Sequence, residues 1–159
     1  MLSKPKFGWS QISVSGKTIG VASYTTDVPF ELLDEFYRYF KHKNNNQKAN
    51  FNIIFDAEGW EFGIFEFSDN LYSISSIESY NKPMVGILLE ELSSERAIEK
   101  LCEEAVNDIK ADISDWAKWN LESGSVEDEE YRRAKSKLEK LIAKTENELL
   151  KYRKRTKRV

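Results

Sequence analysis

Residues 51–76 read FNIIFDAEGWEFGIFEFSDNLYSISS, a stretch in which apolar segments alternate with turn signals. The stretch contains three segments, and β-branched and aromatic residues dominate the first two of them, as is typical of strands. The segments are separated by AEG (57–59) and SDN (68–70), short connections made of residues that favour tight turns. The stretch therefore predicts three consecutive antiparallel strands over 50–56, 60–67 and 71–80.

Strand and helix signals continue on both sides of these three strands. Upstream, WSQISVSGKTIGVASY (9–24) reads as a hairpin that turns at Gly16. Apolar residues then recur at helical spacing over 30–43, after Pro29, which suits the first turn of a helix. Downstream, the apolar run MVGILLEEL (84–92) favours a sixth strand over the start of a helix.

The C-terminal half predicts two long helices. Ser93 or Ser94 is a suitable N-cap for the first, which carries apolar residues at intervals of three and four. This stripe contains Ile98, Leu101, Cys102, Ala105, Ile109, Ile113 and Trp116. The second helix is predicted over 126–156, with acidic residues at its start and basic residues at its end, as the helix dipole favours.

These elements together predict an α+β fold. We expect a five- or six-stranded, mainly antiparallel sheet with one short helix and two long C-terminal helices. Residues 1–122 are expected to form an α+β domain. Residues 126–156 are expected to form a long amphipathic helix that either packs on this domain or faces a partner.

Charge is distributed unevenly along the chain. The 159 residues have a formal net charge of −3, but residues 1–130 contain 24 Asp and Glu against 12 Lys and Arg, whereas 131–159 contain 3 against 12. This asymmetry bears on partners rather than on fold. The single cysteine allows no internal disulfide, and no long apolar run is present. We therefore expect a cytoplasmic protein that does not interact with membranes.

No motif in the sequence names a reaction. Asp56 and Glu58 could pair as general acid and base or bind a hard cation, but they lie two residues apart at a turn, where carboxylates usually accept local hydrogen bonds. His42, the single histidine, and Cys102, on an apolar stripe, have no catalytic partner in the pattern. We predict no enzymatic activity, no cofactor and no metal site.

The basic C-terminal segment is a second candidate interaction site. Its basic side chains would suit a polyanion. They are Lys151, Arg153, Lys154, Arg155, Lys157 and Arg158. The segment could equally be a solvated helix end, or it could neutralise the acidic helix that precedes it. Nucleic acid is disfavoured as a partner, because the acidic residues around the sheet would repel phosphate.

The order of the segments resembles a group of small bacterial proteins. The resemblance covers about residues 10–115 and rests on ISVSGKTIGVASYTTDVPFELLDEF, FDAEGWEFGIFEFSDNLYSISSIES and MVGILLEELSSERAIEKL. These proteins share a SY-x-TD-x-x-x-x-LL entry to the first helix and an acidic D-x-E-G hairpin. The group looks like immunity proteins for polymorphic or contact-dependent toxins. The resemblance therefore implies a protein that binds and neutralises a cognate toxin, although the long basic last helix departs from the pattern.

An immunity protein needs a complementary surface rather than catalytic groups. The candidate partner-binding residues are Asp56, Glu58, Trp60, Glu61, Asp69, Glu99, Glu103, Asp108 and Asp112, of which the last four are expected to lie mostly on a solvent-facing side of their helix. If the toxin is a nuclease, with a positive substrate site, this acid would speed association. Two alternatives stay open: a helix-mediated adaptor module, and a nucleic-acid-associated regulator that uses the basic segment.

Overall fold

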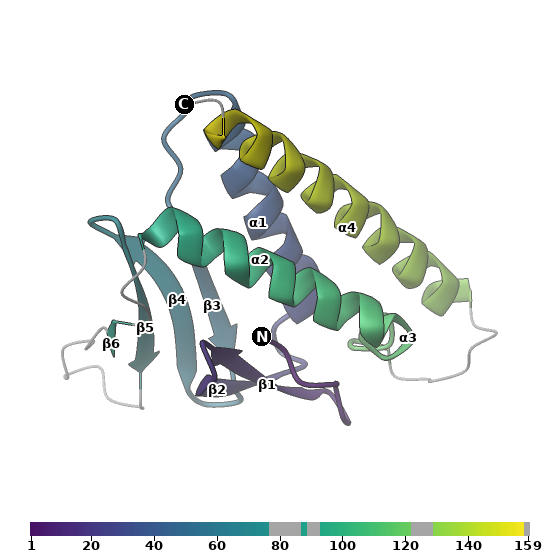
Figure 1. Cartoon of the computed structure of the whole chain (residues 1–159). Coiled ribbons are helices and arrows are strands. Elements are labelled where there is room, and N and C mark those ends of the chain that lie inside the picture. The colour runs from purple at the N-terminus through teal and green to yellow at the C-terminus, as the bar shows by residue number, and fades with distance from the viewer. Residues whose placement is uncertain (77–86, 89–92, 122–128, 158–159) are drawn as a thin grey trace.

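The structure, a computed structural model, describes residues 1–76, 87–88, 93–121 and 129–157 (Figure 1). The strands are β1 (Trp9–Val14), β2 (Lys17–Ser23), β3 (Asn52–Asp56), β4 (Glu61–Phe67), β5 (Asn70–Ser76) and β6 (Ile87–Leu88). The helices are α1 (Val28–Asn44), α2 (Ser94–Ala111), α3 (Ile113–Trp116) and α4 (Glu129–Thr156). The α+β class predicted from the sequence is confirmed.

The strands form two antiparallel sheets rather than one. β1 pairs with β2, and β3, β4, β5 and β6 follow one another in a separate four-stranded sheet. At the outer edge of β3, the N–H groups of Asn52 and Asp56 donate to Glu35 Oε1 (2.8 Å) and Thr26 Oγ1 (2.7 Å). These side chains occupy the edge that β2 would need for pairing. Among the described residues the strands thus form two sheets, and the single sheet of five or six strands expected from the sequence is not found there.

Two-residue turns connect β3 to β4 and β4 to β5. Glu58 and Gly59, between β3 and β4, have φ values of 54° and 121°. Ser68 and Asp69, between β4 and β5, have φ values of 47° and 61°. Positive φ at both central positions matches the right-handed twist of the flanking strands. The antiparallel pairing predicted around AEG and SDN is confirmed, with β5 described as far as Ser76.

One face of the four-stranded sheet packs against α1 and α2. Phe55, Phe62 and Ile64 point from this face into the buried core. A Cβ added to Gly20 of β2 would lie 2.7 Å from the Phe62 ring, so the β1–β2 hairpin packs closely against the same face. The thiol-bearing side chain of Cys102 on α2 is fully buried in this core, as its stripe predicts.

α4 forms an outer layer on α1, on the far side from the sheet (Figure 1). Leu138, Leu149 and Tyr152 of α4 are buried in the same core cluster as the sheet residues. Thr145 Oγ1 also donates to the carbonyl oxygen of Leu33 on α1, at 3.2 Å. The apolar face of the long basic helix is therefore occupied by the chain itself.

The helices differ from the expected set in length and number. α1 has 17 residues against 18 in α2, so the first helix is not short. Its last turn is held by Asn44, whose Nδ2 donates to the carbonyl oxygen and to Oε2 of Glu148, each at 2.9 Å. The four-residue α3 was not expected and buries Trp116. The strand predicted over 84–92 is described only at β6, and its other residues lie outside the described ranges.

Membrane crossing requires a helix that is both long and apolar. No helix among the described residues meets this requirement.

Candidate partner-binding surface

Two acidic residues of α2 bind one arginine of α4. Arg153 donates through Nε to Glu99 and through Nη1 to Glu103 Oε1, the latter at 2.7 Å. The hydrogen bond from Arg153 is the main cause of a lowered pKa of Glu103, and the same bond raises the pKa of the guanidinium. Part of the basic segment thus neutralises the acidic helix, which is one of the alternatives left open by the sequence.

The other two predicted carboxylates on this side contact the N-terminal segment. Asp108 Oδ2 accepts from the N-terminal amine of Met1 at 2.8 Å and from the N–H of Leu2 at 2.7 Å. Asp112 Oδ1 lies 3.4 Å from Lys4 Nζ. Of the four carboxylates predicted on a solvent-facing side, only Glu103 is exposed and the other three are half-buried. All four therefore balance cations of their own chain.

The carboxylates of the β3–β4 hairpin differ from those of α2 in their exposure and contacts. Asp56 Oδ1 accepts the backbone N–H of Glu58 at 2.8 Å, which is the local turn bond expected from the sequence. Glu58 and Glu61 are exposed, and Glu58 makes no ion pair with any residue in the described ranges. The hairpin tip therefore presents acid to solvent.

Trp60 lies beside this tip, whereas Asp69 lies in the β4–β5 turn, at the opposite end of β4. Trp60 is half-buried and stacks on Phe62, with ring centroids 5.1 Å apart. Asp69 is exposed at the next turn, and its carbonyl oxygen accepts the N–H of Ser94 at 2.9 Å. Trp60 thus supports the hairpin from inside, while the Asp69 turn holds the start of α2.

The sheet face opposite α1 and α2 carries side chains in regular cross-strand rows. Ile54, Gly63 and Ile74 form the central row across β3, β4 and β5. Asp56 and Glu61 pair in the row toward the hairpin tip. The third row contains Asn52, Phe65 and Tyr72, and the rings of Phe65 and Tyr72 stack on each other. We name these residues the open face: Asn52, Ile54, Asp56, Glu61, Gly63, Phe65, Tyr72 and Ile74.

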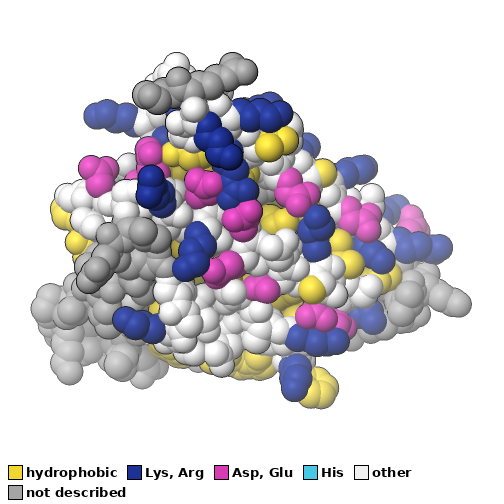
Figure 2. All heavy atoms as spheres, viewed as in Figure 1, with side chains coloured by type: hydrophobic (Ala, Val, Ile, Leu, Met, Phe, Trp, Pro, Cys, Tyr) yellow, Lys and Arg dark blue, Asp and Glu magenta, His cyan; other side chains and the backbone are white. Residues whose placement is uncertain are grey.

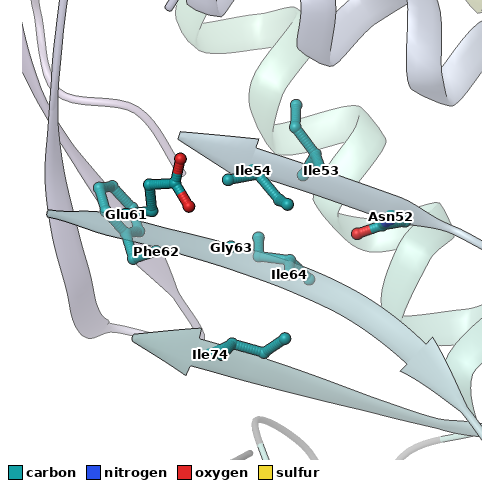
Figure 3. Close-up of a pocket in the computed structure, with 8 residues that line it drawn as sticks. All are labelled: Asn52, Ile53, Ile54, Glu61, Phe62, Gly63, Ile64 and Ile74. Atoms are coloured by element: carbon teal, nitrogen blue, oxygen red, sulfur yellow. The ribbon is translucent and has the colours of Figure 1, made fainter. Parts of the chain in front are cut away.

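Gly63 leaves a hollow at the centre of the open face (Figure 3). The hollow has a volume of about 60 Å³ and is flanked by Ile54 and Ile74. A Cβ at position 63 would collide with the carbonyl oxygen of Ile53, so this close approach of β3 and β4 requires glycine. Small-molecule pockets usually measure about 300–1,000 Å³. The hollow is therefore suited to the end of a single side chain of a partner protein.

Two features determine how a partner could reach the sheet: the exposure of the side chains on the open face, and the hydrogen bonds along the outer edge of β3. Ile54 is 51% exposed, although it lies in the middle of β3. Thr26 and Glu35 bond the outward N–H groups at both ends of β3, which hinders the addition of a partner strand at this edge. A partner would therefore contact the face of the sheet rather than its edge.

The apolar members of the open face were not selected from the sequence. The signal was present, because the adjacent Ile53 and Ile54 place apolar side chains on both faces of one strand. Alternation alone does not tell which face the helices cover. The role of Gly63 depends on the neighbouring strand β3, which local sequence does not reveal.

Two potentially reactive side chains, Cys102 and His42, are wholly or partly buried. Cys102 is buried, and this burial is the main cause of the raised pKa of its thiol. His42 is half-buried near the C-terminal end of α1. Within the described ranges, no group of three or more His, Cys, Asp or Glu is placed to hold a metal ion.

The predicted polyanion-binding residues divide into two sets. Three of them contact side chains of the same chain, namely Lys151 with Glu148, Arg153 with α2, and Arg155 with Asn46. Lys154 and Lys157 are exposed, and Arg158 lies outside the described residues. Only part of this segment is thus available to an external anion.

No protein-family model, no curated protein and no solved structure matches this chain.

Proposed function

We propose that this chain is a non-enzymatic binding protein that neutralises a cognate bacterial toxin in the cytoplasm by occluding the toxin's active or substrate-binding surface. The open face is the observation that carries the proposal. There the exposed Ile54 lies beside the Gly63 hollow, and Asp56 and Glu61 border them. An apolar centre inside a polar margin is the usual anatomy of a protein–protein interface.

The charge beside the open face favours a cationic partner. Glu58 is exposed at the turn next to Asp56 and Glu61, and no described residue forms an ion pair with it. Toxins that cleave nucleic acid need positive substrate sites, because their substrate carries a phosphate backbone. An acidic margin would accelerate association with such a site more than it would strengthen the final complex. A nuclease is therefore the toxin class that the proposal favours.

Two observations support binding over the other candidate functions. The Cys102 thiol is buried away from solvent, so it is poorly placed to act as a nucleophile. The apolar face of α4 packs on α1 and is not free to pair with the helix of another protein, as an adaptor would require. The acidic residues of α2 contribute to the chain's own structure, so the hairpin tip carries the acid of the proposed interface.

Co-expression tests the proposed function. The toxin-like domain encoded next to the gene for this chain is expressed in a bacterial host, with and without the chain, and growth is measured. The proposal predicts arrest without the chain and recovery with it. Arrest that the chain does not relieve would contradict the proposal, and so would a gene neighbourhood that encodes no toxin-like domain.

A further inference from the structure

One side of α4 carries basic residues along most of its length. Positions spaced alternately by four and three residues lie on one side of an α-helix. Six basic residues of α4 follow this spacing, interrupted once at Asn147, and all six are exposed. We name them the basic stripe: Arg133, Lys137, Lys140, Lys144, Lys151 and Lys154. The buried residues Leu138, Ile142 and Leu149 lie on the opposite side of the helix.

Most of this positive charge is not neutralised within the described structure. Arg133 pairs with Glu129, and Lys151 Nζ lies 2.7 Å from Glu148 Oε1. The other four residues of the basic stripe form no ion pair with any residue in the described ranges. About four cations therefore project into solvent along one line.

The basic stripe is separated from the acidic hairpin. α4 is the outer layer on α1, and the four-stranded sheet lies on the other side of α1 (Figure 1). Figure 2 shows Lys and Arg side chains spread along the length of α4. The acid of the β3–β4 hairpin, which disfavours nucleic acid at the sheet, is therefore remote from this helix.

We propose that the basic stripe binds the phosphate backbone of double-stranded nucleic acid. The stripe runs from Arg133 to Lys154, which at about 1.5 Å per residue is about 32 Å. One turn of a DNA duplex has nearly the same length, about 34 Å. Lysines bind phosphates as point charges without reading bases, so the binding is independent of sequence.

The side chains around the basic stripe decide between duplex, single strand and membrane. A single strand is usually held by stacking of its bases on aromatic rings, but Tyr131 and Tyr152 of α4 are buried. A membrane surface would need apolar side chains to insert beside the lysines, and Leu150 is the one large exposed apolar residue among the described part of α4. The phosphate backbone of a duplex requires neither feature.

Fluorescence anisotropy with a duplex of about 20 base pairs tests this proposal over a salt series from about 50 to 200 mM. Four phosphate contacts predict a slope of log K against log salt of about −4. The double variant Lys140→Gln/Lys144→Gln should reduce that slope by about 2. The control Lys17→Gln/Lys48→Gln removes two exposed lysines outside α4 and should leave the slope unchanged.

Several results would overturn the proposal. The first is no binding to the duplex at about 50 mM salt and about 0.1 mM protein. The second is an equal loss in the two double variants, which would show an effect of net charge alone. The third is tighter binding to phosphatidylserine vesicles or to polyglutamate than to the duplex. None of these measurements involves a toxin, so their failure would leave the proposed neutralising function standing.

Discussion

Phe7 has a backbone conformation that is unfavourable for a residue with a bulky side chain. It is 99% exposed and has a φ of 51°, in a two-residue turn closed by the backbone bonds between Lys6 and Trp9. The left-handed conformation costs a residue with a bulky side chain about 1–2 kcal/mol. Asparagine tolerates this conformation, and an exposed ring contributes little burial that could compensate.

Phe7→Asn should therefore raise the free energy of unfolding by about 1 kcal/mol, measured by urea denaturation. Phe67→Asn is the control, because Phe67 is also an exposed phenylalanine but lies in β4 without a positive φ. The control should give no gain in stability. A loss of stability in Phe7→Asn would mean that the ring makes a stabilising contact.

Cys102 gives a second residue-scale prediction. Its thiol is buried, and burial raises the thiol pKa, so little thiolate is present and reagents cannot reach it. DTNB should react slowly with the folded protein and rapidly after urea unfolding. Rapid stoichiometric reaction in the absence of urea would contradict the packing of α2 against the sheet.

At the scale of elements, local pattern predicted more than pairing between distant segments. The β3–β4 and β4–β5 hairpins follow from AEG and SDN, because turn type depends on the residues in the turn. The division into two sheets depends on Thr26 and Glu35, which reach the edge of β3 across 30 and 17 positions of chain, and no local pattern contains that contact. For the same reason, the sequence pattern predicts acidic residues on one side of α2 but does not predict their contact with Arg153.

The contact between α2 and α4 predicts a dependence of stability on pH. The pKa of Glu103 is lower in the folded state, chiefly because Arg153 bonds to it. A carboxyl with a lowered folded pKa stabilises the protein above its unfolded pKa and loses this effect as pH falls through the folded value. The loss should be centred below the unfolded value of 4.5.

Arg153→Gln should therefore lose less stability than the wild type when the pH falls from about 5 to about 3. The difference in the free energy of unfolding should stay below about 1 kcal/mol, because Glu103 is exposed and screened by solvent. Urea unfolding at the two pH values measures it. Lys144→Gln, which removes an exposed cation of the same helix, should retain the wild-type dependence. An identical pH dependence in Arg153→Gln and the wild type would contradict the role of this bond.

At the scale of the whole molecule, two surfaces of different chemistry lie on opposite sides of α1. The open face presents apolar side chains beside acid, and the basic stripe presents cations along α4. The net charge of −3 conceals this division, because the excess acid of residues 1–130 and the excess base of residues 131–159 nearly cancel. The sequence predicted the charge asymmetry from position alone, but only packing determines which acidic residues stay available to a partner.

Electrostatic steering at the hairpin tip predicts a kinetic effect. Glu58→Lys should slow association with the toxin about two- to tenfold at low salt and change dissociation less, because exposed charges act mainly on encounter. Surface plasmon resonance at two salt concentrations measures both rates. Glu139→Lys reverses an exposed carboxylate on α4 and should leave association unchanged. Equal slowing by both variants would indicate that net charge, not the hairpin, steers the encounter.

The affinity of the toxin for Ile54→Lys tests most directly whether the open face is the binding surface. Ile54 is 51% exposed and Leu150 on α4 is 50% exposed, so Leu150→Lys is a control matched in side-chain type and exposure. Lysine is compatible with an edge strand and with a helix, and circular dichroism checks that both variants fold. Titration calorimetry should show a Kd about 10- to 100-fold higher for Ile54→Lys, because burial of the apolar anchor is lost, and no change for Leu150→Lys. Unchanged affinity in a folded Ile54→Lys variant would contradict binding through the open face.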